Sequence, residues 1–398
     1  MERRDFLKKS GLISTGILAS TSAVAAIGSN LGANNTINIG VIGTGSRGGG
    51  LIPILNRIEN VNVAACCDIL PFRLENGLKR AGSKAKGYTD YRKLLDDKNI
   101  DAILVSTPFS THSDIATDAV DAGKHVYCEK TMAKGIKGIK KLVLKVSESK
   151  NVFQTGHQYH SSKLYNHVVK MIKDGEIGKI ISFECQWNRN GDWRRKVPDP
   201  SLERAINWRM YREYSGGLTA ELSSHQIDFI HWVLDENPKK IMGVGGIDYW
   251  KDGRETFDNT HLIFEYPSGV KAKFTCLTSN ALGDYQIRVH GSKGTIQLDY
   301  TKAWIYYEKG FEKELVDVDG VSGATKNPYL QGKGNIINVS SIDPTKQALI
   351  DFKDAIIDNK TPISNVYTGA STAVAVQLSL DAMYKEKIVY WKNEYNFK

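Results

Sequence analysis

Two side chains that could move a proton, Glu221 and His225, lie four residues apart. A helix is expected over about residues 217–234, and this spacing places both on one helix face, with Asp228 one turn further on. A carboxylate beside an imidazole raises the pKa of the imidazole and fixes its tautomer, which suits acid-base chemistry near neutral pH. A zinc-site fragment or a buried structural pair would show the same spacing. No third metal ligand stands out, so acid-base chemistry is favoured and no metal is expected.

A third candidate, Lys130, follows the apolar run 125–128 and Glu129, at the expected end of a strand. An ammonium group there could polarise a carbonyl or, with a lowered pKa, share a proton with a substrate oxygen. The alternative is an ordinary exposed lysine at a strand end. Lys130, His225 and Glu221 are therefore the expected catalytic residues.

These residues need a cofactor site beside them, and residues 36–50 (TINIGVIGTGSRGGG) predict one. A buried strand over 37–42 runs into a glycine turn and then a helix. Gly43 permits the turn, Gly45 lets the backbone approach a pyrophosphate, and Gly48 allows close packing of helix and strand. The pattern predicts a dinucleotide site rather than an ordinary glycine-rich loop.

A second apolar run, residues 61–67, ends in Asp68, 20 residues after Gly48. An acid at this position binds the ribose hydroxyls of adenosine and repels a 2′-phosphate, which favours NAD over NADP. Arg73 lies near enough in sequence to leave that choice open. The alternative for the whole pattern is an ordinary βαβ unit with an acidic strand end.

Apolar strands over 101–107, 125–130 and 151–156 alternate with helices, which predicts a doubly wound parallel sheet (a Rossmann domain) over residues 36–158. Ligands bind at the carboxyl ends of such strands. The second part, residues 159–398, shows alternating stretches such as 261–266 and 270–274 joined by a Pro-Ser-Gly turn. It is expected to be an α+β substrate-binding domain with a mainly antiparallel sheet. An open face of that sheet makes a homo-oligomer plausible.

Segments 187–195 and 207–211 combine tryptophan with arginine, asparagine and tyrosine. Aromatic faces stack on pyranose rings while polar groups bond hydroxyls, so a small carbohydrate substrate is expected. A surface loop pinned by buried tryptophans is the alternative. The expected substrate-binding residues are Tyr159, Asn188, Arg189, Trp193, Arg194, Trp208, Arg209 and His225.

Composition fits two soluble domains: 398 residues, 41% hydrophobic and 24% charged, with a formal net charge of +9. The basic residues are dispersed, so no nucleic-acid partner is expected.

Residues 1–35 are expected to be a signal peptide and linker, because Arg3-Arg4 and the mildly apolar run after it match the twin-arginine pattern. That pattern predicts export to the periplasm by the twin-arginine machinery, with no stable membrane anchor. The five cysteines are odd in number and sit mostly in apolar strands, so they are expected to be buried and reduced.

The motifs together resemble those of the Gfo/Idh/MocA family of sugar-directed, nicotinamide-dependent oxidoreductases. The likeness runs from Thr36 almost to the C-terminus, through the glycine turn, Ser106-Thr107-Pro108, Glu129-Lys130, residues 175–178 and residues 216–225. Two positions depart from the family pattern: Thr131 replaces a usual proline, and Glu221 replaces a common aspartate, which puts its role in doubt. The cofactor-binding residues implied are Gly43, Gly45, Ser46, Arg47, Gly48, Asp68, Ser106, Thr107, Pro108, His112, Glu129, Lys130 and Gln158.

The resemblance implies an exported enzyme that keeps NAD bound and oxidises or reduces a ring hydroxyl of a sugar or glycoside, such as the hydroxyl on C3. One alternative is an NAD-dependent, redox-assisted glycosidase, although the chain lacks the His-Gly-x-Gly-Pro stretch expected of that branch. The other alternative is a non-catalytic sugar-binding protein with the same fold.

Overall fold

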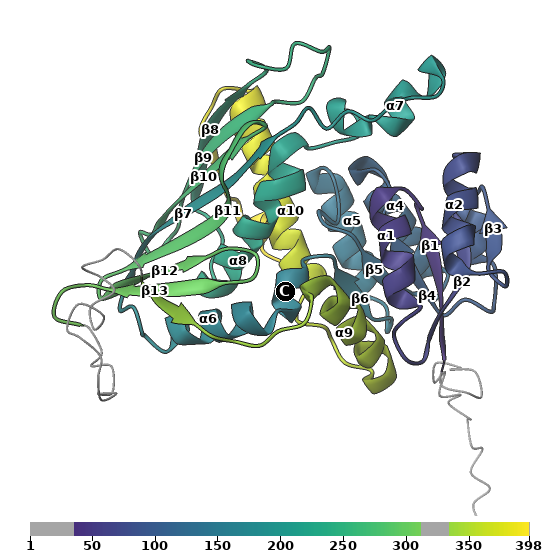
Figure 1. The fold of residues 1–398 in the computed structure, drawn as a ribbon, viewed down its shortest axis with the longest axis horizontal. Helices are drawn as coiled ribbons and strands as arrows, with labels where there is room; N and C mark the ends of the chain where they lie inside the picture. The colour runs from purple at the N-terminus through teal and green to yellow at the C-terminus, as the bar shows by residue number, and fades with distance from the viewer. Residues whose placement is uncertain (1–35, 312–333, 398) are drawn as a thin grey trace, which may run out of the picture.

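The computed structural model describes residues 36–311 and 334–397, and its first domain is built on a six-stranded parallel sheet (Figure 1). The strand order is β3-β2-β1-β4-β5-β6, which confirms the predicted doubly wound sheet. The strands are β1 (Ile37–Ile42), β2 (Val61–Cys67), β3 (Lys86–Tyr88), β4 (Ala102–Val105), β5 (His125–Cys128) and β6 (Phe153–Thr155). The expected signal peptide, residues 1–35, lies outside the described residues.

Helices cover both faces of this sheet. Helices α3 (Tyr91–Leu95), α4 (His112–Asp121) and α5 (Ile136–Ser147) bury apolar side chains against one face. Helices α1 (Ser46–Leu55), α2 (Pro71–Ala81) and α9 (Pro344–Asp358) pack on the other. Phe352 of α9 meets Tyr127 of β5 edge-on, with ring centroids 5.7 Å apart. Helix α9 therefore completes the first domain from the far end of the chain, which a division at residue 158 does not capture.

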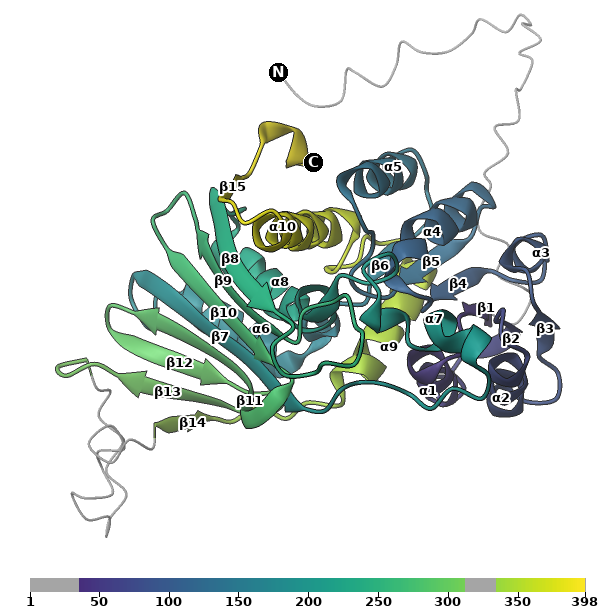
Figure 2. The same cartoon turned by 90° about the horizontal axis from the view of Figure 1, so that it is seen from above.

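The second domain is a nine-stranded sheet in the order β14-β13-β12-β11-β7-β10-β9-β8-β15 (Figure 2). Its pairs are antiparallel except β10 with β7, so the predicted mainly antiparallel sheet is confirmed. The strands are β7 (Ile180–Asn190), β8 (Lys240–Gly246), β9 (Asn259–Glu265), β10 (Lys271–Leu277), β11 (Ser279–Gly291), β12 (Gly294–Leu298), β13 (Ala303–Tyr307), β14 (Asn335–Ile337) and β15 (Val389–Tyr390).

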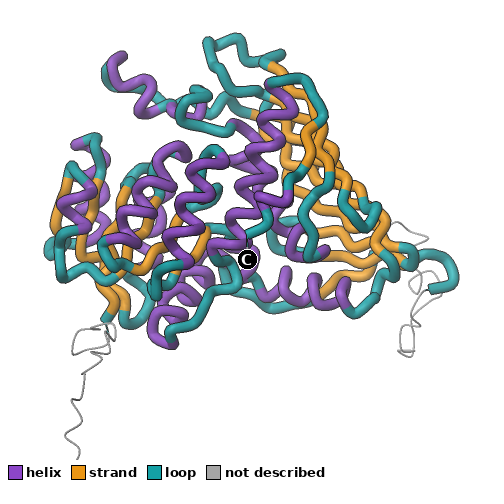
Figure 3. Tube along the Cα trace, turned by 180° about the vertical axis from the view of Figure 1, so that it is seen from behind, coloured by secondary structure: helices purple, strands orange, loops and turns teal. Residues whose placement is uncertain are grey.

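Three helices fill the space between the two sheets: α6 (Lys163–Lys173), α8 (Ser224–Leu234) and α10 (Val366–Tyr384) (Figure 3). Their buried side chains belong to the same apolar cluster as residues of both sheets, such as Val105 and Phe274. The two domains therefore share a core, and residues on either side of the joint are held in a fixed relation. In residues 36–311 and 334–397, no helix is long and apolar enough to span a membrane.

Residues 191–214, here named the crossing segment, leave β7 and pass over the first domain. The segment contains the short helix α7 (Glu203–Ile206), which both views place over the first domain rather than its own sheet (Figures 1 and 2). One end is tied to the second domain, where Arg254 donates a hydrogen bond to the carbonyl of Asp192 (2.8 Å). The other end is tied to the first domain, where the amide of Ser110 donates to the carbonyl of Tyr214 (3.1 Å).

Candidate active site

The glycine turn between β1 and α1 is built for a close-lying ligand. Gly43 has φ +89°, and a Cβ at Gly48 would lie 1.9 Å from the Gly43 carbonyl oxygen, so both positions require glycine. A Cβ at Gly45 would meet nothing nearer than the Arg73 guanidinium, at 3.6 Å. Helix α1 begins at Ser46 with no side-chain cap and no acid in its first turn. Its free N–H groups and the space above Gly45 fit a pyrophosphate, as expected for NAD.

Asp68 lies at the end of β2 and supports this turn. Its carboxylate accepts hydrogen bonds from the amides of Thr44 (2.9 Å) and Leu70 (3.0 Å). A carboxylate can accept about four hydrogen bonds, which leaves capacity for the ribose hydroxyls. Asp68 thus both holds the turn and presents its charge to the cavity.

Two side chains, Arg47 and His112, link helix α1, the loop after β4 and the loop after β5. Arg47 in the first turn of α1 forms an ion pair with Glu129 (2.6 Å). The ring nitrogens of buried His112 lie 2.9 Å from the carbonyl oxygens of Thr107 and Thr131, so His112 joins the loop after β4 to the loop after β5. These contacts position Lys130, whose peptide bond to Thr131 is cis.

The Lys130 ammonium reaches the second domain at a π-helical turn, Thr219–Ser223. It donates to the carbonyl oxygen of Glu221 (2.9 Å) within this turn. Burial lowers the pKa of Lys130, and Glu221 and Glu129 oppose that effect. Lys130 is therefore a partly buried, anchored ammonium rather than an exposed lysine at a strand end.

The Glu221 carboxylate is paired with an arginine and not with His225, contrary to the expected pair. Among the described residues, Nδ1 of His225 has no hydrogen-bond partner, so the Glu221 carboxylate does not fix its tautomer. The Glu221 carboxylate instead accepts a hydrogen bond from Arg209 (2.7 Å). Burial acts to raise the pKa of Glu221, but Arg209 and Lys130 outweigh it and the pKa is lowered.

His225 is buried among aromatic rings at the inner end of the cavity. The centroids of Tyr159, Trp187 and His157 lie 5.3, 5.6 and 5.8 Å from its ring. Burial, followed by the positive charge of Lys130, lowers the pKa of His225 well below its usual value. His225 is therefore neutral in this site and able to accept a proton.

Asp228, one helical turn beyond His225, turns toward other histidines. A carboxylate oxygen lies 2.9 Å from Nε2 of His160, and the other lies 3.8 Å from Nδ1 of His157. Burial opposes ionisation of Asp228, but His157 and His160 lower its pKa overall. The carboxylate stabilises the histidines behind His225, not His225 itself.

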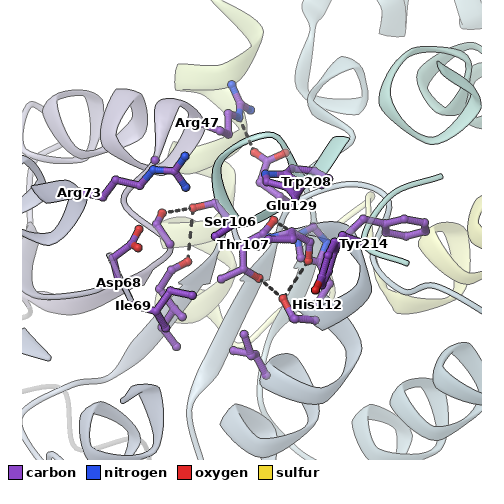
Figure 4. Close-up of a pocket in the computed structure, with 18 of the residues that line it drawn as sticks. Arg47, Asp68, Ile69, Arg73, Ser106, Thr107, His112, Glu129, Trp208 and Tyr214 are labelled. Carbon is purple, nitrogen blue, oxygen red and sulfur yellow. Dashed lines mark hydrogen bonds and ion pairs between the residues drawn. The ribbon is translucent and has the colours of Figure 1, made fainter. Parts of the chain in front are cut away.

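One cavity of about 1280 Å³ joins the glycine turn to His225 (Figure 4). It is lined by all three expected catalytic residues and by every expected cofactor residue except Gly48, which packs beneath the turn. Asp68 and Arg73 stand on one side of the close-up, and Glu129, Trp208 and Tyr214 stand on the other. Trp208 and Arg209 also line it, with the Arg209 guanidinium 4.2 Å from the centroid of the Trp208 ring.

Five of the expected substrate residues do not line this cavity. Tyr159 stacks on Tyr165 (4.4 Å) behind His225. Asn188 shares a face of β7 with Gln186, opposite Trp187, because β7 continues to Asn190 and its side chains alternate. Both amides donate to the carbonyl of Leu282, so Asn188 is a structural contact.

The other three are arginine and tryptophan side chains with partners elsewhere. Arg194 donates to Asp252 (2.9 Å), and so fixes the crossing segment. Exposed Arg189 lies over the outer side of Trp187 (5.6 Å), and Trp193 is half-buried against the apolar core.

The sequence did not single out several residues of the crossing segment and its end that line the cavity: Arg195, Ser201, Arg204, Ala205, Ile206 and Tyr214. The signal available was the arginine content of this segment, but nothing local distinguishes Arg195 from Arg194.

Among the described residues, no cluster of His, Cys, Asp and Glu could hold a metal ion.

Two family models match the chain. One, described as the oxidoreductase family with an NAD-binding Rossmann fold, matches residues 37–157, and the other, the GFO/IDH/MocA C-terminal domain, matches residues 165–297. The chain belongs to the Gfo/Idh/MocA family. It is therefore an enzyme of an NAD-binding oxidoreductase family, and the dinucleotide that fits its glycine turn is NAD.

Curated relatives of this family member include sugar and cyclitol enzymes. The chain is 27% identical to the 2,7-anhydro-N-acetylneuraminate hydratase of Escherichia coli, over 66% of this chain and 68% of the relative. It is 27% identical to an inositol 2-dehydrogenase of Salmonella typhimurium, over 52% of this chain and 57% of the relative. The structure of levoglucosan dehydrogenase with NADH and levoglucosan shares the fold, with a TM-score of 0.70, 20% identity, and coverage of 89% and 99% of the two chains.

Proposed function

We propose that this family member is an exported oxidoreductase that acts on a ring hydroxyl of a sugar or glycoside and retains its NAD between turnovers. The observation that carries the proposal is the continuity of the cavity from Gly45 and Asp68 to Lys130 and His225. A dinucleotide extended from the glycine turn would bring its reactive ring toward the same end as the two proton-handling groups.

The side chains fit the two halves of an alcohol oxidation. NAD, when bound by the turn and Asp68, supplies the hydride acceptor for the carbon. Neutral His225 accepts the hydroxyl proton, and the Lys130 ammonium, fixed by the Glu221 carbonyl, donates a hydrogen bond to the substrate oxygen as it becomes a carbonyl. The reverse steps reduce a ketone.

A sugar substrate is supported by the residues at this end of the cavity and by the relatives. Trp208 presents an aromatic ring, and Arg209 can bond hydroxyls beside it. Inositol and levoglucosan, named in the relatives, are ring polyols. The proposed reaction takes place at a ring carbon such as C3.

The proposed retention of NAD and the proposed export of the folded protein are consistent with each other. The crossing segment lines the cavity and is bonded to both domains, so it would cover a bound dinucleotide. Export in a folded state through the twin-arginine machinery, to which Arg3 and Arg4 point, would carry NAD out with the protein. The five cysteines are buried and unpaired, and folding before export would leave them reduced.

A second candidate, transient oxidation that assists elimination from a glycoside, is favoured by one relative. A hydratase adds or removes water without net oxidation of its substrate, and such a relative covers two thirds of this chain. A redox-assisted glycosidase would use Lys130 and His225 in the same way but return the hydride within each turnover.

Association of copies is also proposed, through the face of the second sheet that the described helices do not cover. Val244 of β8 and Ile263 of β9 are exposed there, at 68% and 45%. Size-exclusion chromatography with light scattering tests this directly, and a monomer at all concentrations would contradict it.

The product identifies which chemistry operates. The protein is incubated with a panel of glycosides, with and without added NAD, and the products are analysed by mass spectrometry. A keto product lacking two hydrogens supports the oxidoreductase, whereas free sugar without a keto product supports the glycosidase. If Lys130→Ala and His225→Ala variants match the parent in every assay, the catalytic assignment of these two residues is wrong.

A further inference from the structure

Two arginines from different domains line the cavity at the glycine turn, and neither forms an ion pair within the described residues. Among the arginines that line the main cavity, Arg47, Arg92, Arg204 and Arg209 each have an ion pair in the described structure. No such pair is found for Arg73 of α2 or Arg195 of the crossing segment within the described residues. Burial lowers the pKa of Arg73, the Asp68 carboxylate acts to raise it, and Arg195 acts to lower it, so the charges of the two arginines interact.

A second hollow, of about 260 Å³, lies against the same turn. It shares Gly45, Ser46, Arg73, Arg195 and Ile206 with the main cavity. Its other basic residues are Arg80 and Lys196, and no acidic residue lines it. Unpaired guanidinium groups beside a free helix N-terminus form an anion site, and the anion they fit is a phosphate of the dinucleotide.

The backbone of Arg195 is held in place for this role. Buried Asn207 accepts a hydrogen bond from the Arg195 amide (2.7 Å) and donates to its carbonyl (3.1 Å). Arg194, the next residue back, is fixed by Asp252. The guanidinium of Arg195 is thus delivered to the turn on a rigid stretch of the second domain, at little ordering cost on binding.

We propose that Arg195 binds the pyrophosphate of NAD from above the glycine turn, opposite Arg73, and so slows release of the cofactor. This inference rests on the proposed cofactor retention and not on the identity of the sugar. The dinucleotide cannot leave until the crossing segment withdraws this charge. The second domain then contributes to cofactor binding as well as to substrate binding.

The test measures cofactor release without any sugar. Protein loaded with NADH is mixed with excess adenosine diphosphate ribose, and the loss of bound NADH fluorescence gives the dissociation rate. Arg195→Gln is expected to speed release about 10- to 100-fold, the effect of removing a charge-assisted hydrogen bond. Arg189→Gln, which removes an exposed arginine that lines neither the main cavity nor the smaller hollow, is the matched control and is expected to change the rate less than threefold.

Equilibrium binding identifies the group recognised. Arg195→Gln should weaken binding of adenosine diphosphate ribose, which carries the pyrophosphate, and leave adenosine binding unchanged. A greater loss for NADPH than for NADH would assign Arg195 to a 2′-phosphate and overturn the pyrophosphate assignment. Equal NADH release by Arg195→Gln and the parent, with unchanged thermal unfolding, would overturn the role altogether, whatever sugar the enzyme uses.

Discussion

The Lys130 ammonium donates a hydrogen bond to the backbone carbonyl of Glu221, 2.9 Å away across the two domains. This carbonyl belongs to the π-helical turn at residues 219–223 of the second domain. The contact fixes the ammonium beside the place where substrate oxygen and cofactor would meet, so the geometry of the reaction depends on the joint between the sheets.

Lys130→Met should therefore lower kcat by about 10²- to 10⁴-fold, because the substrate oxygen loses its charged donor. NADH affinity should change little. Steady-state kinetics and NADH fluorescence titration measure the two quantities. Lys141→Met removes an exposed lysine from the rim of the same cavity and is the control. Equal loss in both variants would contradict a specific role for Lys130.

The pH profile of sugar oxidation follows from the same two groups. His225 must be neutral to accept a proton, and burial and Lys130 lower its pKa well below 6.5, so kcat/KM should fall only when the pH drops well below 6.5. Lys130 must be charged, and burial lowers its pKa from 10.5, so activity should fall as pH rises through a value below 10.5. The alkaline limb should be absent in Lys130→Met. An unchanged alkaline limb would assign it to another group.

Two glycine variants distinguish an effect on folding stability from an effect on NADH binding. Gly48→Ala places a methyl group 1.9 Å from the Gly43 carbonyl, so it should lower the melting temperature as well as abolish NADH binding. Gly45→Ala fits the protein, since its Cβ would meet nothing within 3.6 Å. It should keep the parent melting temperature and weaken NADH binding about tenfold or more, because the methyl group occupies the space of the pyrophosphate. Tight NADH binding by Gly45→Ala would place the dinucleotide elsewhere.

Trp208 should contribute to sugar binding but not to cofactor binding. Its ring lines the cavity under the Arg209 guanidinium and is 8% exposed. Trp208→Ala should raise KM for the sugar about tenfold and leave NADH release unchanged, and Trp208→Phe, which retains a ring, should recover part of the loss. Trp193→Ala, in the same segment but away from the cavity, should not raise KM. The assignment fails if Trp193→Ala raises KM as much as Trp208→Ala.

The first domain and its glycine turn could be predicted because their determinants are local. Gly43, Gly48 and Asp68 act through backbone geometry within one βαβ unit. The partner of Glu221 could not be predicted in this way, because its carboxylate is bonded to Arg209 of the crossing segment, and that contact depends on the tertiary structure.

The substrate-binding residues were also harder to predict, because they too depend on tertiary contacts. Asn188 faces away because β7 runs to Asn190, and Arg194 is taken by Asp252, 58 residues later in the chain. Arg195, the next residue, reaches the cavity instead. Only the position of the crossing segment over the first domain distinguishes the two arginines.

The most direct test of the account uses the protein purified without added nucleotide. It is mixed with each glycoside of a panel, and reduced-nicotinamide absorbance is recorded. The account predicts a single rise, equal in amount to the protein, with at least one sugar, since a resident NAD is reduced once and stays bound. A preparation that releases no NAD on denaturation, and shows no rise with any sugar until NAD is added, would contradict it.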